Sequence, residues 1–534
     1  MGAPLPSPEE LAAARRINVW NDFVPQWLRF PLIIVIIVVF LFSGGVYMSA
    51  VNQMVGTTSW ITEDVLMAGY ASMVGLTVAF PVLFRIVFRF RTRDILMCSA
   101  VVFIVCDYIS MVSTFVPLVV AVSFISGFFK IVSTFACWNN IQLCITPRRD
   151  FAVFFPFLFA FVLGTVQLVN IATGYSIYAF DWQAMHRLTI GAFIIVFAII
   201  YFGMRRHYRQ GPYMPFYGID YLGGIMWTLF LITMVFIFVY GDHYDWLEGE
   251  PIRVAIFFAL MLLAINLHRA STIRHPYISI ETFSQKNMLW IFLLFGFMTL
   301  MSATAGSVLN IFTEGILGYD ARHAIDNSWG TLVGVASGAG FFYIAFSKWK
   351  WRLKNIVLSG FVSFFMFQVM LYFLIDASTD KGMLYLPLFF KGMGVGIVYT
   401  TLTYALAGCV TFIYYFQAMC VIGFIRTAFG GPLCSAVVTR VFKYVRLENL
   451  ANLSTEIDDM NPLSESFSTI YGELQRPVMM VSLKEVFGYA VIASILIILS
   501  ILLSDYRNYF TQTPQKIFRL SQAQIWRLLR KSID

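Results

Sequence analysis

Residues 218 to 246 read GIDYLGGIMWTLFLITMVFIFVYGDHYDW, and this stretch carries no charged side chain between Asp220 and Asp242. A helix of about 20 apolar residues is long enough to cross the hydrocarbon core of a bilayer. The stretch lacks the alternation of polar and apolar residues that marks a barrel strand. In lipid, a helix also satisfies its backbone hydrogen bonds internally. The stretch therefore predicts a transmembrane helix.

The rest of the chain repeats this pattern. Hydrophobic residues make up 59% of the 534 residues and charged residues 12%, whereas globular chains are about half apolar and about a quarter charged. This composition excludes a water-soluble enzyme and predicts an all-α polytopic membrane protein. Fourteen runs qualify as spans: 30–50, 65–84, 95–116, 118–145, 151–179, 188–204, 220–241, 254–268, 288–312, 328–346, 355–375, 384–407, 411–437 and 486–504.

The basic residues support this count. About two thirds of the 37 Lys and Arg residues lie in segments that would be cytoplasmic if the N-terminus is inside, as the positive-inside rule requires. An even number of spans also predicts a cytoplasmic C-terminus. The basic residues are scattered between apolar runs and do not gather on one face, which argues against a nucleic-acid partner.

Motifs for nucleotide or metal chemistry are absent. Neither the P-loop pattern GxxxxGK[ST] nor the zinc pattern HExxH occurs, and the seven Cys residues contain no CxxC pair. We therefore expect no cofactor, no metal and no enzymatic activity. A carrier or channel, or a structural membrane protein, remains.

Five segments, in order along the chain, resemble the fourteen-helix drug:proton antiporter branch of the major facilitator superfamily, the EmrB/QacA type. The first is the stretch quoted above, and the others are HPYISIETF at 275–283, EGILGYD at 314–320, FFKGMGVGI at 389–397 and IRTAFGGPLCSAVV at 425–438. The resemblance implies a proton-coupled exporter in the inner membrane of a bacterium that works by alternating access. Similar exporters work with a periplasmic adaptor protein, which is therefore an expected partner besides protons, the lipid bilayer and a small amphipathic substrate.

The resemblance also implies two six-helix lobes, at 30–204 and 288–504, joined by a pair of extra helices within 205–287. The sequence shows a trace of this repeat, since SGFFK at 126–130 and KGMGVG at 391–396 occupy corresponding positions in the two lobes. Outside the lobes, we expect a cytoplasmic segment at 1–29 and an amphipathic basic tail at 505–534 on the inner leaflet. The C-terminal lobe includes an external segment at 438–485. Trp20 and Trp27 are expected to be interfacial anchors.

Four ionisable residues stand well inside the predicted spans: Asp107, Lys130, Lys391 and Arg426. Each costs at least roughly 2.5 to 3.5 kcal/mol at the bilayer centre, so each needs a partner or a use. Lys130 and Lys391 lie on helices that line the central cavity in the resembled fold, and together they would attract an anionic group. Alternatively, each extends to the membrane surface or pairs with Asp107.

Uncharged polar residues add to this candidate site. Asn139 and Asn310 are candidates for substrate binding, although hydrogen bonding between helices is the simpler role for both. For proton coupling the candidates are Asp107 and Glu314. The alternatives are that Asp107 is a buried partner of a basic neighbour and that Glu314 is a solvated acid near the outer surface.

Three arginines are candidates for gating. Arg426 matches an arginine of the resembled branch, and packing between lobes is its alternative role. Arg91 and Arg93 belong to LFRIVFRFRTRD at 83–94, which keeps the basic residues of the branch's motif between helices 2 and 3 but lacks its acid. The acid of the first helix is also replaced, by Tyr47.

The sequence thus predicts a secondary-active exporter of amphipathic, anionic compounds. Two alternatives use the same residues differently. The first is an uptake carrier for an organic anion or a siderophore-like solute, because the same scaffold can run in either direction. The second is a membrane scaffold that transports nothing, because several motifs of the resembled branch have decayed.

Overall fold

The computed structural model describes residues 19–43, 46–146, 150–210, 213–285, 287–319, 325–454 and 467–504. Within these ranges the regular structure is helical, apart from one isolated β-bridge between Trp20 and Met204. Thirteen of the described helices are long and apolar enough to cross a membrane, judged by length and composition. They correspond in order to the second to fourteenth predicted spans. The predicted basic tail at 505–534 lies outside the described residues.

The first predicted span, 30–50, covers most of one helix and all of a second, and a third short helix follows it. They are α2 (Gln26–Phe42), α3 (Val46–Ser49) and α4 (Val51–Thr57). α2 contains 17 residues and ends where the backbone of Ser43 becomes extended, at φ −62° and ψ 140°. The chain therefore leaves the helical conformation within the first apolar run, at a point that hydropathy alone does not reveal.

Single long helices follow in the rest of the range predicted for the N-terminal lobe, 30–204. They are α5 (Thr62–Arg89), α6 (Thr92–Val112), α7 (Val116–Ile145), α8 (Phe151–Ala179) and α9 (Trp182–Gly203). The linking region contains α10 (Tyr221–Tyr240), the short η1 (Trp246–Glu248), α11 (Glu250–Thr272) and α12 (Glu281–Ser284).

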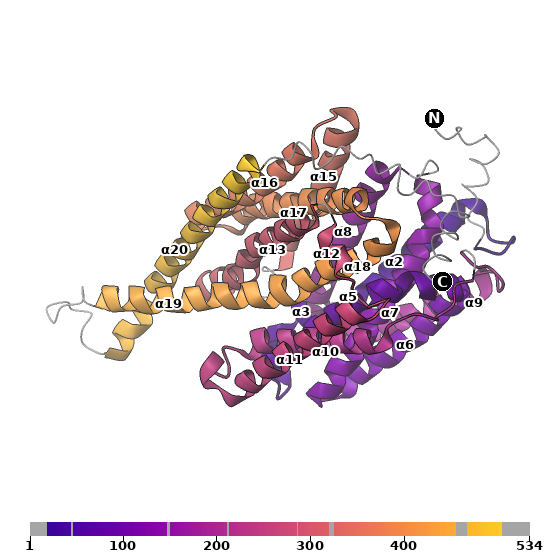
Figure 1. Cartoon of the computed structure of the whole chain (residues 1–534). Helices are drawn as coiled ribbons and strands as arrows, with labels where there is room; N and C mark the ends of the chain where they lie inside the picture. The colour runs from indigo at the N-terminus through magenta and orange to yellow at the C-terminus, as the bar shows by residue number, and fades with distance from the viewer. Residues whose placement is uncertain are drawn as a thin grey trace.

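The described part of the range predicted for the C-terminal lobe, 288–504, contains three π-helical segments. Its elements are α13 (Met288–Asn310), the π-helix η2 (Ile311–Ile316), α15 (Ser328–Tyr343), the π-helix η3 (Ile344–Lys348), α16 (Leu353–Leu374), α17 (Lys381–Cys409), α18 (Phe412–Phe424), the π-helix η4 (Ile425–Leu433), α19 (Cys434–Ser454) and α20 (Phe467–Leu503). α19 and α20 pack together at one end of the molecule (Figure 1) and account for the described part of the predicted external segment.

Two helix pairs at corresponding positions, α5 with α7 and α15 with α17, pack closely because each pair has a glycine at the contact. A Cβ atom on Gly127 of α7 would lie 1.8 Å from the carbonyl oxygen of Ser72 on α5, and one on Gly392 of α17 would lie 2.3 Å from the carbonyl oxygen of Thr331 on α15. No other residue permits these backbone approaches without displacement. Gly127 and Gly392 belong to the two segments in which the sequence shows its repeat.

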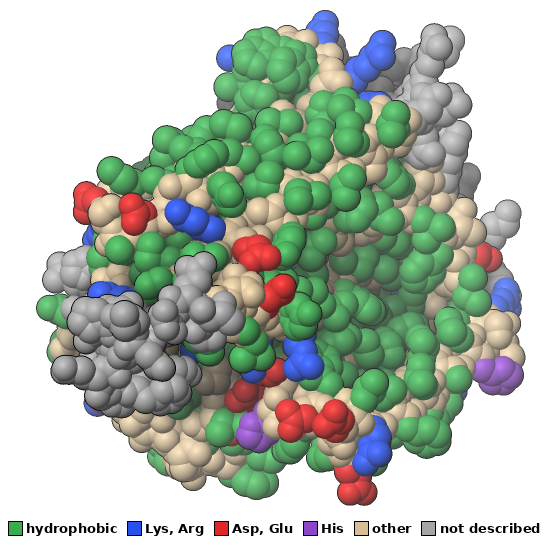
Figure 2. Space-filling model, turned by 90° about the vertical axis from the view of Figure 1, so that its left-hand side faces the viewer, with side chains coloured by type: hydrophobic (Ala, Val, Ile, Leu, Met, Phe, Trp, Pro, Cys, Tyr) green, Lys and Arg blue, Asp and Glu red, His purple; other side chains and the backbone are tan. Residues whose placement is uncertain are grey.

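The extra helix α10 lies beside both lobes. Trp227 of α10 contacts the ring of Phe424 of α18 at 5.3 Å between centroids, and the Tyr240 hydroxyl donates a hydrogen bond of 2.5 Å to Asp64 of α5. α11 packs mainly against α10, at the edge of the bundle in Figure 1. Hydrophobic side chains cover much of the face shown in Figure 2, as expected for a protein surrounded by lipid.

The two tryptophans predicted as interfacial anchors differ in their exposure to solvent. Trp27 is 75% exposed, as an interfacial anchor requires, but Trp20 is fully buried. The prediction for Trp20 was wrong because its ring packs on Gly203 at the end of α9, where a side chain would leave no room.

Candidate functional site

Lys130 of α7 binds the C-terminal end of α2. Its Nζ donates a hydrogen bond of 2.7 Å to the carbonyl oxygen of Ser43, and the Ser43 and Ser126 hydroxyls lie 3.2 Å apart. The last carbonyls of a helix lack partners within the helix and carry a partial negative charge. The break after α2 therefore supplies the partner that an intramembrane lysine needs.

Arg426 lies at the start of η4, and aromatic residues of both lobes surround its partner. Its Nη1 donates a hydrogen bond of 3.2 Å to the Tyr399 hydroxyl of α17. The Tyr399 ring lies 4.9 Å from that of Phe159 on α8 and 5.4 Å from that of Phe295 on α13. The guanidinium group is thus held where α8 of the N-terminal lobe meets α13 and α17. π-helical turns occur frequently at functional sites.

Lys130 and Arg426 are close enough for their positive charges to repel each other, while Asp107 attracts Lys130. One cation comes from each lobe. The sequence paired Lys130 with Lys391 instead. Lys391 is half-buried on α17, and within the described ranges it makes no hydrogen bond or ion pair. The positively charged neighbour of Lys130 is therefore Arg426.

Asp107 and His186 form a buried pair within the N-terminal lobe. Asp107 Oδ1 lies 3.3 Å from His186 Nδ1, and the two residues are 5% and 1% exposed. His186 is thus a basic neighbour of the kind that the sequence proposed for Asp107. Asp107 Oδ2 and His186 Nε2 are buried without a hydrogen-bond partner in the described part of the chain. We call Asp107, His186, Lys130 and Arg426 the central charge cluster.

His186 was missed by the sequence analysis because the predicted span began at 188. The helix α9 begins earlier, at Trp182, so the second turn of the helix carries His186 into the protein. A local signal was available, since the side chain of Asp181 caps the helix by accepting a hydrogen bond of 2.8 Å from the backbone N–H of Ala184. An aspartate before an apolar run marks a helix start more sharply than hydropathy does.

Tyr47 of α3 extends this polar region. Its hydroxyl faces those of Ser110 and Ser123 without a hydrogen bond of good geometry, and its ring centroid lies 6.1 Å from that of His186. The sequence predicts that Tyr47 replaces the first acid of the resembled branch. The structure thus brings this position next to the Asp107 and His186 pair.

The other polar candidates lie away from the cluster. Asn139 donates a hydrogen bond of 2.8 Å to Gln210, in the segment after α9. Nine residues of helix, about 13 Å, separate it from Lys130. Asn310 is exposed at the end of α13, and Glu314 lies in η2, where Arg476 of α20 donates a hydrogen bond of 3.0 Å to the carbonyl oxygen of Ile316.

Arg93 connects two helices of one lobe. It is buried on α6, its Nη2 donates a hydrogen bond of 2.8 Å to the carbonyl oxygen of Tyr201 on α9, and its guanidinium lies 4.9 Å from the Tyr201 ring centre. Arg91 is the half-buried residue preceding α6. The described contacts of Arg93 thus lie within the N-terminal lobe.

No family model and no curated protein matches this sequence. Among solved structures, the fold is similar to the peptide transporter POT in complex with alafosfalin, with a TM-score of 0.58 and 12% identity over 93% of this chain and 98% of that one. It is also similar to the nucleoside transporter NupG, with a TM-score of 0.51 and 12% identity over 89% of this chain and 99% of that one. For the xylose transporter XylE from E. coli, the TM-score is 0.50 and the identity 10%, over 94% of this chain and 99% of that one.

At these identities the similarity concerns the fold. The three structures are transporters of the major facilitator type. The chain therefore has a major facilitator fold, and its many apolar helices make it a multi-pass membrane protein.

Proposed function

We propose that this chain is a secondary-active transporter for an amphipathic organic anion, and that Lys130 and Arg426 bind the anionic group. The observation that carries the proposal is the approach of these two cations from different lobes. Like charges in a poorly solvated region repel strongly, and an anion between them removes that repulsion. A bound anion would therefore also connect the lobes that must move against each other in alternating access.

The apolar part of the substrate is proposed to bind to the aromatic residues beside Arg426. Phe159, Phe295 and Tyr399 form a cluster with rings from both lobes. Aromatic side chains offer large apolar contact areas with defined geometry. An anionic head near the cations and an apolar body on these rings make up the amphipathic substrate that the sequence predicted.

Asp107 and His186 are proposed to carry the proton. Both are ionisable and buried, both have an unpartnered polar atom in the described structure, and Asp107 acts electrostatically on Lys130. A change in the charge of Asp107 thus changes the potential at the anion site. Glu314, the other acid named from the sequence, lies in η2 next to Asn310.

The direction proposed from the resemblance to the EmrB/QacA type is export in exchange for protons. The sign of the electrostatic coupling supports a second candidate function, uptake together with protons. Protonation of Asp107 removes a negative charge near Lys130, which makes the site more positive and strengthens the binding of an anion. Proton and anion then bind together, and ligands that bind together are carried in the same direction.

Transport by the purified chain in proteoliposomes tests these proposals. The assay compares a fluorescent alkyl sulfonate with a matched alkyl ammonium. Replacing Lys130 or Arg426 by Met should lower sulfonate transport at least about tenfold, since a hydrogen bond to a charged group contributes roughly 1.5 to 3 kcal/mol. Lys391→Met is the matched control, because this lysine lies on α17 without a charged neighbour in the described structure.

The transport assay distinguishes the anion site from its alternatives. An equal loss of sulfonate transport in Lys391→Met would support the sequence-based prediction that Lys130 and Lys391 bind the anion together. Transport of the ammonium compound alone would contradict the anion site. A proton gradient that is acidic outside should drive the sulfonate inward for uptake and outward for exchange. Absence of any transport would favour the membrane scaffold.

A further inference from the structure

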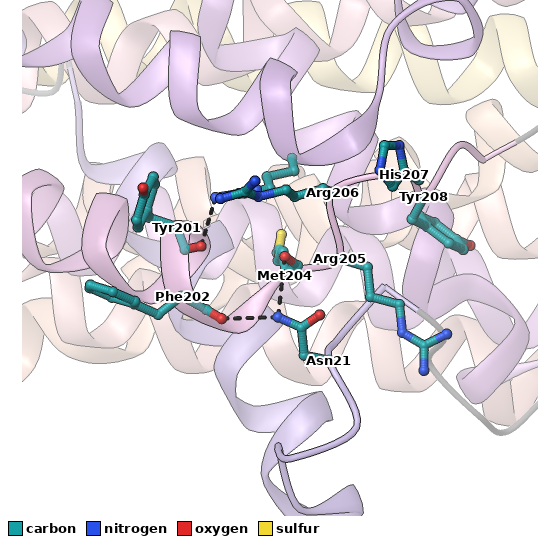
Figure 3. A pocket seen from close by; sticks show the side chains of 9 residues that line it. Asn21, Tyr201, Phe202, Met204, Arg205, Arg206, His207 and Tyr208 are labelled. Atoms are coloured by element: carbon teal, nitrogen blue, oxygen red, sulfur yellow. Dashed lines mark hydrogen bonds between the residues drawn. The ribbon is translucent and has the colours of Figure 1, made fainter.

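Besides the central charge cluster, the molecule has a basic region at the C-terminal end of α9. The positive-inside rule assigns this end of the helix to the cytoplasmic side. A pocket of about 820 Å³ is lined there by Asn21, Arg93, Tyr201, Arg205, Arg206 and Tyr208, among others. Figure 3 shows the pocket and labels all of these residues except Arg93. The pocket lies between the ends of α6 and α9, the segment before α2 and the segment after α9, and the proposed transport function does not use it.

The pocket has a fixed wall on one side. The backbone N–H of Asn21 donates a hydrogen bond of 2.8 Å to the carbonyl oxygen of Gly203, and its side-chain Nδ2 donates one of 3.0 Å to the carbonyl oxygen of Phe202 (Figure 3). The backbone N–H of Arg205 donates a hydrogen bond of 2.9 Å to the carbonyl oxygen of Val19. These bonds hold the chain before α2 against the end of α9, so this wall of the pocket has a defined position.

The lining carries more positive than negative charge. Arg93, Arg205 and Arg206 contribute three guanidinium groups, while Asp22 pairs with Arg205. Arg93 is 6% exposed, and its Nε is buried without a hydrogen-bond partner in the described residues. A buried donor without a partner is costly, and a bound acceptor removes that cost.

Exposed aromatic residues lie next to the pocket. Phe202 and Tyr201 of its lining are 69% and 43% exposed, and Phe23, two residues along the chain from Asn21, is 71% exposed. Aromatic residues are enriched where a membrane protein meets the lipid headgroups. The basic pocket therefore lies at the depth of phosphate groups, next to the apolar surface that acyl chains cover.

We propose that this pocket binds the phosphate group of an anionic phospholipid. Guanidinium groups recognise phosphate oxygens through charge-assisted hydrogen bonds, and basic pockets between transmembrane helices hold such headgroups. Burial raises the pKa of the Tyr208 phenol, which therefore stays protonated and can donate a hydrogen bond. The aromatic surface favours a lipid over a soluble phosphate as the source of the group.

Native mass spectrometry of the purified full chain tests the proposal with three probes: phosphatidylglycerol, phosphatidylcholine and inorganic phosphate. The exposed Arg206 can be replaced by Gln without disturbing the core. Arg206→Gln should weaken phosphatidylglycerol binding about fivefold, the effect of one basic residue near an anionic headgroup. Asp22→Asn should strengthen it by a similar factor, because the acid that competes for Arg205 is lost. A merely destabilised protein would not bind more tightly.

Arg209→Gln is the matched control. Arg209 is exposed on the same segment, contacts Tyr213 and does not line the pocket, so its loss should change binding less than twofold. Equal affinity for phosphatidylcholine, or equal effects of Arg206→Gln and Arg209→Gln, would overturn the proposal. Binding of inorganic phosphate without preference for phosphatidylglycerol would also overturn it and would indicate a soluble anion.

Discussion

Asp107 and His186 show how a single buried residue depends on its partner. Removing His186 leaves Asp107 with no hydrogen bond in the described structure. We therefore expect His186→Ala to lower the free energy of unfolding by about 1 to 3 kcal/mol. Adding Asp107→Asn should recover part of this loss, because no buried carboxylate then remains without a partner. Thermal unfolding in detergent measures both variants.

His268 provides the control for this pair, since it is exposed near the end of α11. His268→Ala should change the unfolding free energy by no more than about 0.5 kcal/mol. If the double variant were less stable than His186→Ala alone, the pair would not be held by the contact between the two side chains.

The sequence could find the members of the central charge cluster that stand alone in apolar runs. Asp107, Lys130 and Arg426 are visible in this way because an intramembrane charge is rare. It could not show that Lys130 is joined to Arg426 and to the end of α2. The hydrogen bond to Ser43 depends on how α7 packs against α2, and the nearness of Arg426 depends on where η4 lies, and hydropathy encodes neither. His186 lay beyond the predicted end of its span.

At the scale of helices, the approach of α5 and α7 depends on Gly127. A methyl group there would meet the Ser72 carbonyl oxygen at 1.8 Å, so the two backbones must separate. Overpacking of this kind costs about 1 to 3 kcal/mol, and we expect Gly127→Ala to lower the unfolding temperature. Gly340 of α15 has no atom within 4 Å of its Cβ position. Gly340→Ala should leave stability unchanged or raise it, because Ala favours the helix by about 1 kcal/mol.

An equal effect of Gly127→Ala and Gly340→Ala on thermal unfolding would show that close packing is not what Gly127 contributes. The positions of the helices themselves were predictable, since thirteen of the fourteen predicted spans correspond to single long helices or to helices continued by a π-helical segment. The first span was not, because the break after Ser43 arises from backbone conformation within an apolar run. Ser43, Gly44 and Gly45 are residue types that favour a turn, but hydropathy averages them with the apolar residues on both sides.

For the whole molecule, alternating access requires the lobes to separate at each end in turn. The end of α8 that is predicted to face outward approaches the segment before α15 at Gly174, where a Cβ atom would lie 1.9 Å from the Ile325 side chain. Both Cγ atoms of Ile325 lie within 2.8 Å of that position, so its Cβ is near the separation of about 3.5 to 4.5 Å that a disulfide needs. Gly174→Cys with Ile325→Cys in a background without other cysteines should therefore cross-link on oxidation. We expect the cross-link to lower sulfonate transport at least about tenfold. Reductant should restore it, and either single variant should be insensitive to oxidant. Transport that continues after complete cross-linking would show that these surfaces do not separate in the cycle, and the lobes would then have to move about a different interface.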